Sequence, residues 1–270
     1  MASPLSRLNQ LYFVFQVGSR IPLDDVTICK ACCFFHKFCE EEKEAVNLYD
    51  LYSVAAACLS LASKVCDDPP ASSSLRDIIN VSYRNLHPNE PPLQLEEQFY
   101  DLRDSLSSME LHLLRVLQFN TDFANSHKYL CHYLLSVKKW MPPASEYHSG
   151  SLLLPTALTI HRDIHLCPAV LKYPPQIIAL AAIYLAMALL DYELVGFEAS
   201  SKQSPTEHQN LHSSSAYMSG KAPKKDWFQV FYPDAAKQTL ETFCNEFMQL
   251  LVKKNESLNS SSNDLSSETL

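Results

Sequence analysis

The stretch LYDLYSVAAACLSLASKVC, residues 48–66, predicts a helix that is apolar on almost every side. One stripe at helical spacing consists of Leu51, Val54, Cys58, Leu61 and Val65. Alanines and a further leucine occupy the other sides, where a surface helix would carry charges. Because a helix that is apolar all round is buried among other elements, we expect this one to form the centre of a helical bundle.

A second stretch of the same kind, PPQIIALAAIYLAMALLDY, covers residues 174–192. Its segment LAAIYLAMA (180–188) aligns without gaps with AACLSLASK (56–64), so that Leu59 falls on Ile183. This offset is too long for a solenoid repeat. It predicts a duplicated helical domain, with two bundles of about five helices, each around its own central buried helix. The predicted fold class is therefore all-α.

Apolar residues at helical spacing predict the helices around these two centres. In the first half they cover residues 5–17, 22–42, 74–83 and 95–117. In the second half they cover residues 126–140, 151–164 and 233–253. We expect Gly18 to end the first of these helices, because glycine is common just past a helix C-terminus.

We predict two domains, at residues 5–124 and 125–254. Two segments lack helical periodicity and are expected to be disordered. Residues 198–226 carry seven serines and form an insertion in the second domain, and residues 255–270 carry six serines and form a tail.

Composition excludes several classes of protein. The chain has only four glycines among 270 residues, and none are spaced as in the Gly-rich loops that bind phosphates. A net charge of −8 argues against a nucleic-acid-binding protein. The polar N-terminus, the nine cysteines and the lack of a long apolar run predict an intracellular chain with reduced thiols and no membrane span. Lys221, Lys224 and Lys225 are a weak nuclear-import signal, so nucleus and cytoplasm both stay open.

Three motifs suggest chemistry that the rest of the chain does not support. His161-Arg162-Asp163 resembles the kinase HRD motif, but the other kinase motifs are missing. CKACCFFHKFC (29–39) suggests zinc, but ligands along one straight helix cannot surround a tetrahedral ion, and we expect no second closely spaced Cys/His pair. A thiol enzyme would need a local signature around a cysteine, which we do not find. We predict no catalytic residue, cofactor or metal.

Two charged residues stand out against apolar neighbours. Lys64 lies at the end of the central helix, where Asp67 and Asp68 follow it as nearby acids. Glu110 lies in the middle of the predicted helix 95–117, and the residues three and four positions away include no cation. A carboxylate at such a position needs a partner from another helix. Structural and functional roles are both open for these residues.

Two stretches resemble the cyclin box: LYSVAAACLSLASKVCDD (51–68) and MELHLLRVLQF (109–119). Shorter segments resemble the cyclin-Q group of that family, and they are HKFC (36–39), LRDIINVSYR (75–84), FYDLRDS (99–105), HKYLCHYL (127–134) and WFQVFYPD (227–234). The resemblance covers about residues 5–253. It implies tandem cyclin-box folds, with the kinase-binding box at residues 5–124.

The resemblance also implies a function. It implies a regulatory subunit, not itself an enzyme, that binds and activates a cyclin-dependent kinase by holding the kinase αC helix inward. For the cyclin-Q group this partner is cyclin-dependent kinase 10. Lys64 and Glu110 match the lysine and glutamate that contact the kinase, and Leu61, Leu106 and Leu113 are expected to line an apolar groove beside them. Ala188 stands where Lys64 would fall in the second copy, so only the first box is expected to carry this contact.

Two alternatives use the same fold. A protein similar to general transcription factor IIB would carry a zinc ribbon and a basic face, and this chain has neither. A cyclin-fold scaffold would bind partner peptides without activating a kinase, and it differs from a cyclin only in activity.

Overall fold

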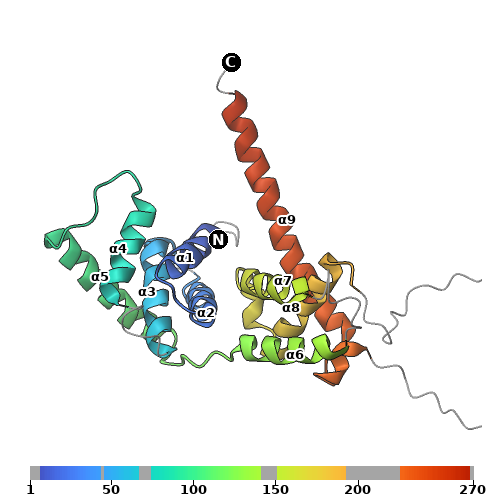
Figure 1. The fold of residues 1–270 in the computed structure, drawn as a ribbon. Helices are drawn as coiled ribbons and strands as arrows, with labels where there is room; N and C mark the ends of the chain where they lie inside the picture. The colour runs from blue at the N-terminus through green and yellow to red at the C-terminus, as the bar shows by residue number, and fades with distance from the viewer. Residues whose placement is uncertain (1–6, 44–45, 67–73, 141–150, 193–225, 268–270) are drawn as a thin grey trace, which may run out of the picture.

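A computed structural model describes residues 7–43, 46–66, 74–140, 151–192 and 226–267, and every regular element in these ranges is helical. The first half contains α1 (Leu8–Arg20), α2 (Asp25–Glu41), η2 (Val46–Leu48), α3 (Leu51–Val65), α4 (Leu75–Leu86) and α5 (Glu97–Val116). The second half contains α6 (Ser126–Trp140), α7 (Ser151–Ile164), η5 (Pro168–Leu171), α8 (Pro175–Leu189), η6 (Trp227–Val230) and α9 (Lys237–Ser267). The two halves follow one another in Figure 1, and the all-α class is confirmed.

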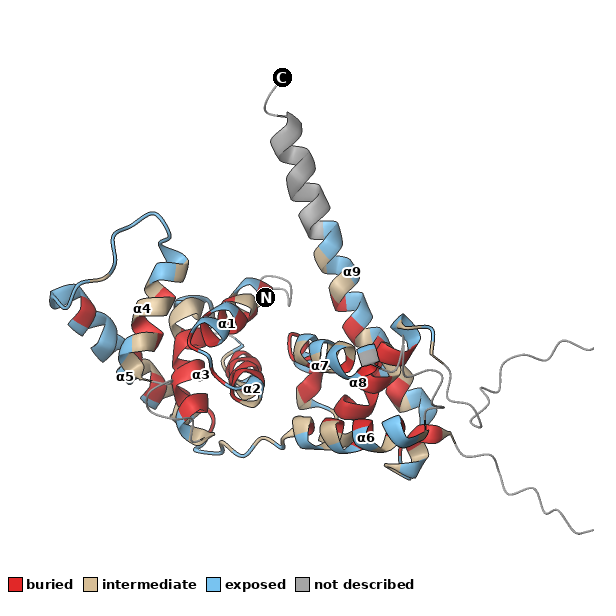
Figure 2. Ribbon diagram, viewed as in Figure 1, coloured by how far each residue is buried: buried red, intermediate tan, exposed pale blue. Residues whose placement is uncertain are grey.

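Helix α3 is the centre of the first half, as its composition predicts. It contacts α1, α2, α4 and α5, and its residues from Val54 to Ser63 are all buried. Asp50 caps its N-terminus, because the carboxylate accepts hydrogen bonds from the backbone N–H groups of Tyr52 and Ser53 at 3.1 and 3.3 Å. The burial view shows α3 mostly red between its less buried neighbours (Figure 2).

Helix α8 is the corresponding centre of the second half. It packs against α6, α7 and α9, and its residues from Ile177 to Ile183 are all buried. The predicted duplication is therefore visible in the packing. The described part of the second half contains four α-helices and two short 3₁₀ helices, so it has one α-helix fewer than the first half.

Gly18 does not end α1, which continues to Arg20. The prediction was wrong because Gly18 serves packing between helices. A Cβ atom at this position would lie 2.7 Å from Cγ1 of Ile28 in α2 and 3.5 Å from Cδ2 of Leu59 in α3. The missing side chain lets α1 approach both helices closely.

The C-terminal helix also differs from the expectation. Helix α9 runs to Ser267, well past the expected end at Lys253, so residues 255–267 of the expected disordered tail are helical. Residues 268–270 lie outside the described residues. Extending an existing helix is much easier than starting one, and the residues after Lys253 include no glycine or proline to stop it. Residues 198–225 of the predicted insertion lie outside the described residues.

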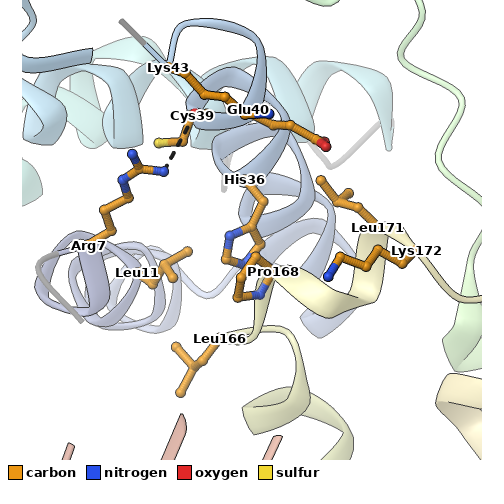
Figure 3. A pocket seen from close by; sticks show the side chains of 10 residues that line it. All are labelled: Arg7, Leu11, His36, Cys39, Glu40, Lys43, Leu166, Pro168, Leu171 and Lys172. Carbon is orange, nitrogen blue, oxygen red and sulfur yellow. Dashed lines mark hydrogen bonds between the residues drawn. The ribbon is translucent and has the colours of Figure 1, made fainter. Parts of the chain in front are cut away.

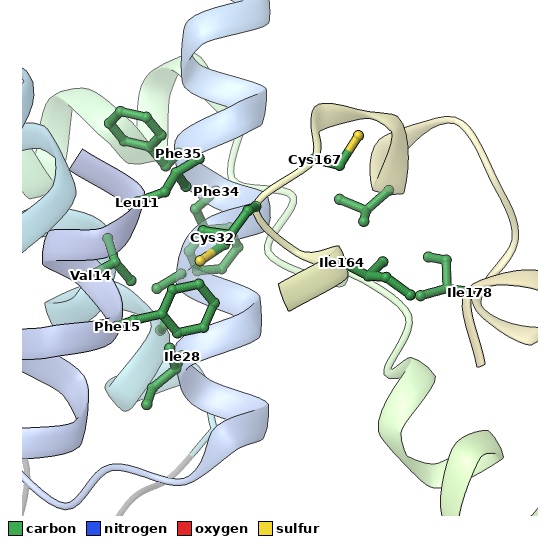
Figure 4. Close-up of a cluster of buried hydrophobic side chains, with 14 of the residues drawn as sticks. Leu11, Val14, Phe15, Ile28, Cys32, Phe34, Phe35, Ile164, Cys167 and Ile178 are labelled. Atoms are coloured by element: carbon green, nitrogen blue, oxygen red, sulfur yellow. The ribbon is translucent and has the colours of Figure 1, made fainter. Parts of the chain in front are cut away.

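One apolar core continues from the first half into the second. Figure 4 shows Cys32 and Phe34 of α2, with Ile164 and Cys167 at and just after the end of α7. Arg162 adds polar contacts across the same boundary. Its guanidinium lies 4.9 Å from the ring centroid of Phe15, its Nη2 donates to Ser19 Oγ at 2.6 Å, and its Nη1 lies 3.7 Å from Asp25 Oδ1. These contacts hold the two halves together.

Among the described helices, none combines the length and the apolar composition that crossing a membrane requires.

Candidate functional site

The two charged residues that stand out in the sequence form an ion pair. Lys64 lies in the last turn of α3 and Glu110 lies in the second half of α5. The Lys64 ammonium donates to both carboxylate oxygens of Glu110, with Nζ–Oε1 at 2.6 Å and Nζ–Oε2 at 2.9 Å. The predicted partner from another helix is therefore Lys64. Asp67 and Asp68, the other expected partners of Lys64, lie outside the described residues.

Ser60 holds the carboxylate from inside the bundle. Its hydroxyl donates to Glu110 Oε2 at 2.8 Å, and Ser60 itself is buried, one turn before Lys64 on α3. Glu110 thus accepts three hydrogen bonds from a single helix. Charge-assisted bonds of this kind are stronger than neutral ones and restrict the carboxylate to one orientation.

The pair is exposed on one side only. The Glu110 side chain is 12% exposed, whereas the Lys64 side chain is 59% exposed. An ammonium group carries three donors, and the carboxylate takes two of them. Lys64 therefore keeps a donor for an acceptor outside the chain, beside a carboxylate that is already fixed.

The three leucines expected beside this pair are core residues in the structure. Leu61, Leu106 and Leu113 are 4%, 6% and 0% exposed, so none of them lines an open groove. They pack α3 and α5 together behind the ion pair. The apolar residues that α5 presents to solvent are instead Tyr100, Leu102 and Leu111, and Leu111 directly follows Glu110.

Sequence reasoning missed these exposed residues because leucines occur on several sides of α5. Its hydrophobic pattern alone does not show which side faces α3. The available signal was the position of Glu110. Because its partner had to come from a neighbouring helix, the side of α5 that carries Glu110 had to face that helix.

A second group of polar residues lies buried between α2 and α7. The ligand atoms of Cys29, His161 and His165 all lie within 4.8 Å of one another, which is close enough for the three side chains to share a metal ion. Burial lowers the pKa of His161 to about 2 and that of His165 to about 4, and it raises the pKa of the Cys29 thiol. The expectation of no second closely spaced Cys/His pair was wrong: His161 in the last turn of α7 and His165 directly after that helix are four residues apart.

A cavity of about 340 Å³ opens between the two halves, and its lining residues are drawn in Figure 3. Leu11, Leu166, Pro168 and Leu171 form its apolar wall, and the cations Arg7, Lys43 and Lys172 lie around it with Glu40. Arg7 donates to the backbone carbonyl of Cys39 at 3.5 Å. This cavity shares no residue with the site on α3 and α5.

Comparison with known proteins agrees with the first helical bundle seen in the packing. Residues 2–122 match the family model of the cyclin N-terminal domain. Cyclin-K of Danio rerio is 24% identical over 238 residues, which cover 88% of this chain and 48% of the relative. Cyclin-T1 of Mus musculus is 24% identical over 88% of this chain and 28% of the relative, and Cyclin-T1-2 of Arabidopsis thaliana is 28% identical over 71% and 40%. The chain thus spans less than half the length of each of these relatives.

Proposed function

We propose that this chain, a homologue of the cyclins with a cyclin N-terminal domain at residues 2–122, is the regulatory subunit of a cyclin-dependent protein kinase. The observation that carries the proposal is the Lys64–Glu110 pair, which lies inside that domain with a fixed carboxylate and a half-exposed ammonium. These two groups are the proposed anchors for backbone groups of the kinase.

The chain would act by binding, with no chemistry of its own. A protein kinase is active when its β3 lysine and its αC glutamate form an ion pair. A surface that binds the inward position of αC better than the outward position shifts the kinase toward the active state. The phosphoryl transfer itself belongs to the kinase.

The energy required shows what the anchors can and cannot supply. Converting a population of 1:99 into 99:1 takes a preference of about 5.5 kcal/mol for the inward state. Hydrogen bonds to charged groups contribute about 1.5–3 kcal/mol each, so the anchors could supply much of this only if they engaged the inward state alone. At about 25 cal/mol per Å², some 220 Å² of additional apolar contact with the inward state would also be enough. Leu111 and Tyr100, exposed on α5, are the proposed sources of that apolar contact.

For the particular kinase we propose cyclin-dependent kinase 10. The support is the resemblance of the segments at 36–39, 75–84, 99–105, 127–134 and 227–234 to the cyclin-Q group. A domain arrangement with the kinase-binding box at 5–124 and a second box at 125–254 goes with this proposal, as does a location in the nucleus or the cytoplasm.

Co-expression with a panel of cyclin-dependent kinases tests the proposal. The full chain is co-expressed with each kinase, and complex formation is measured by affinity capture followed by gel filtration. We expect a 1:1 complex with cyclin-dependent kinase 10 and loss of that complex in the double variant Lys64→Ala/Glu110→Ala. The matched control is Lys237→Ala/Glu241→Ala, which removes an ion pair of 3.8 Å on α9 in the second half.

Each outcome decides a different part of the proposal. A complex with another kinase only would contradict the choice of partner while keeping the cyclin function. A complex that forms without any gain in phosphotransfer would favour a scaffold that binds partners through a cyclin fold. No complex with any kinase would contradict the proposed function as a whole.

A further inference from the structure

We propose that Cys29 of α2, His161 of α7 and His165, which directly follows α7, form a zinc-binding site that joins the two halves of the chain. The three side chains are buried, at 6%, 2% and 4% exposure. Their ligand atoms all lie within 4.8 Å of one another, although α2 and α7 belong to different halves. The inference is independent of the proposed function, because none of these residues contributes to the Lys64–Glu110 pair.

The donor set and its spacing suit zinc. Zinc binds thiolate sulfur at about 2.3 Å and imidazole nitrogen at about 2.0–2.1 Å. Ligand atoms on a tetrahedral zinc ion are consequently about 3.3–3.6 Å apart. Side-chain rotations that close the present separations by about 1 Å would reach that geometry. His161 and His165 are four residues apart across the end of α7, and both imidazoles lie close to the thiol from α2.

Hydrogen bonds prepare both imidazoles for a metal. His165 Nδ1 lies 2.8 Å from the backbone carbonyl of His161. Since a carbonyl only accepts, Nδ1 carries the proton, and the Nε2 lone pair is left for a ligand. His161 Nε2 lies 2.8 Å from the hydroxyl of Ser126, which leaves Nδ1 of that ring. A carbonyl or hydroxyl on the far nitrogen is the arrangement that orients histidines bound to metals.

A small cavity lies at the same place. Its volume is about 30 Å³, and Cys29, Ser126, His127, His161 and His165 all line it. A cavity of this size holds one small ion or one water molecule. The Nδ1 atom of His127 is buried and has no hydrogen-bond partner among the described residues, and its ring centroid lies 5.4 Å from that of His161. His127 is not part of the group of three close ligand atoms, but it lines the same cavity with an unpaired nitrogen, so we propose it as the fourth ligand.

Zinc binding takes neutral imidazoles and a deprotonated thiol. Binding would therefore release the thiol proton of Cys29 to solvent, and the cation would neutralise the buried thiolate.

Such a site would fix the two halves relative to one another. Cys29 lies near the start of α2, which packs against the central helix α3. His161 lies in the last turn of α7, which packs against the central helix α8, and His165 directly follows that helix. A metal shared by α2 and α7 would join the two bundles directly, in addition to the apolar core and Arg162.

Metal content of the full chain tests the inference. The chain is purified under reducing conditions without a polyhistidine tag, stripped with a chelator, dialysed against zinc and analysed by mass spectrometry for metal per chain. Cobalt is then added to the stripped wild type, where a cysteine ligand produces a sulfur-to-cobalt charge-transfer absorption. We expect about one zinc ion per chain and the charge-transfer absorption.

Variants assign the ligands. Cys29→Ala and His161→Ala should each weaken zinc affinity at least about tenfold in competition with a chromophoric chelator. Cys244→Ala is the matched control, because Cys244 is 5% exposed and lies on α9, away from the cluster. Circular dichroism shows whether each variant is folded.

Two results would overturn the site. One is a wild-type chain that retains far less than one zinc ion and shows no charge-transfer absorption with cobalt. The other is a Cys29→Ala variant that binds zinc as tightly as Cys244→Ala. The cobalt spectrum needs only the wild type, so the inference is tested even if the cluster variants do not fold.

Discussion

Replacing Gly18 by alanine should destabilise the chain, although alanine is the better helix former. In the interior of a helix such as α1, alanine is favoured over glycine by about 1 kcal/mol. The added Cβ would lie 2.7 Å from Cγ1 and 2.9 Å from Cδ1 of Ile28, which is 1% exposed and has little room to move. Carbon atoms pack at about 3.5–4.0 Å, so Ile28 would have to shift by about 1 Å.

The helix preference and the steric overlap oppose one another, and their sizes predict the sign of the net change in the free energy of unfolding. Overpacking a core by one methyl group costs about 1–3 kcal/mol. The short contacts put Gly18→Ala in the upper part of that range, so we expect a net loss of about 1–2 kcal/mol in the free energy of unfolding. For a chain of this size the loss corresponds to about 2–8 °C in Tm. Urea unfolding and thermal melting of the full chain both measure it.

A double-mutant cycle isolates the cause. Ile28→Ala removes both atoms that the new Cβ would meet. In the Ile28→Ala background only the helix preference for alanine over glycine remains. There Gly18→Ala should leave the free energy of unfolding unchanged or raise it by up to about 1 kcal/mol. If Gly18→Ala leaves the wild-type background as stable as before, the close approach of α1 to α2 is not what requires glycine.

Four further substitutions, two tests and two controls, probe the packing around the site and between the halves. Ser60→Ala removes a buried hydrogen bond to the Glu110 carboxylate, so unfolding should become easier by about 1.5–3 kcal/mol in urea titrations. Ser63→Ala, at the same 1% exposure but bonded only to the backbone carbonyl of Ser60, should cost about 0.5–1.5 kcal/mol, and equal losses would argue against a charge-assisted bond. Arg162→Ala removes the contacts with Phe15, Ser19 and Asp25 and should cost about 1–2 kcal/mol in the same titrations. Arg103→Ala, whose ring contact and ion pair stay within α5, should change the free energy of unfolding by less than about 0.5 kcal/mol, so a similar loss in both arginine variants would contradict the role of Arg162 between the halves.

The central helices could be predicted because their composition determines their position. A helix that is apolar on every side is not stable at a surface. The helices predicted at 48–66 and 174–192 therefore had to be the centres of the two bundles. Lys64 and Glu110 were recognisable for the opposite reason. Each is a charge among apolar neighbours, and Glu110 lacks a cation within reach on its own helix.

The remaining features depend on contacts between distant parts of the chain. Gly18 looked like a helix terminus because local sequence does not show that α2 and α3 cross α1 at that point. Leucines occur on several sides of α5, so the sequence does not show which of them are exposed. The expectation that Leu61, Leu106 and Leu113 line an open groove could be tested only with the packing of α5 against α3. Cys29 meets His161 and His165 only after the two bundles dock, and no local spacing indicates that meeting.

The most direct test of the proposed function is a kinase titration. Purified cyclin-dependent kinase 10 is held at a fixed concentration, the full chain is added in increasing amounts, and the rate of phosphotransfer to a peptide is measured. The account predicts a saturable increase in rate with wild type, and a half-maximal concentration at least about tenfold higher with Lys64→Ala, since one lost charged hydrogen bond is worth about 1.5–3 kcal/mol. The control Lys237→Ala should match wild type. An unchanged rate at every wild-type concentration, or equal titration curves for wild type and Lys64→Ala, would contradict it.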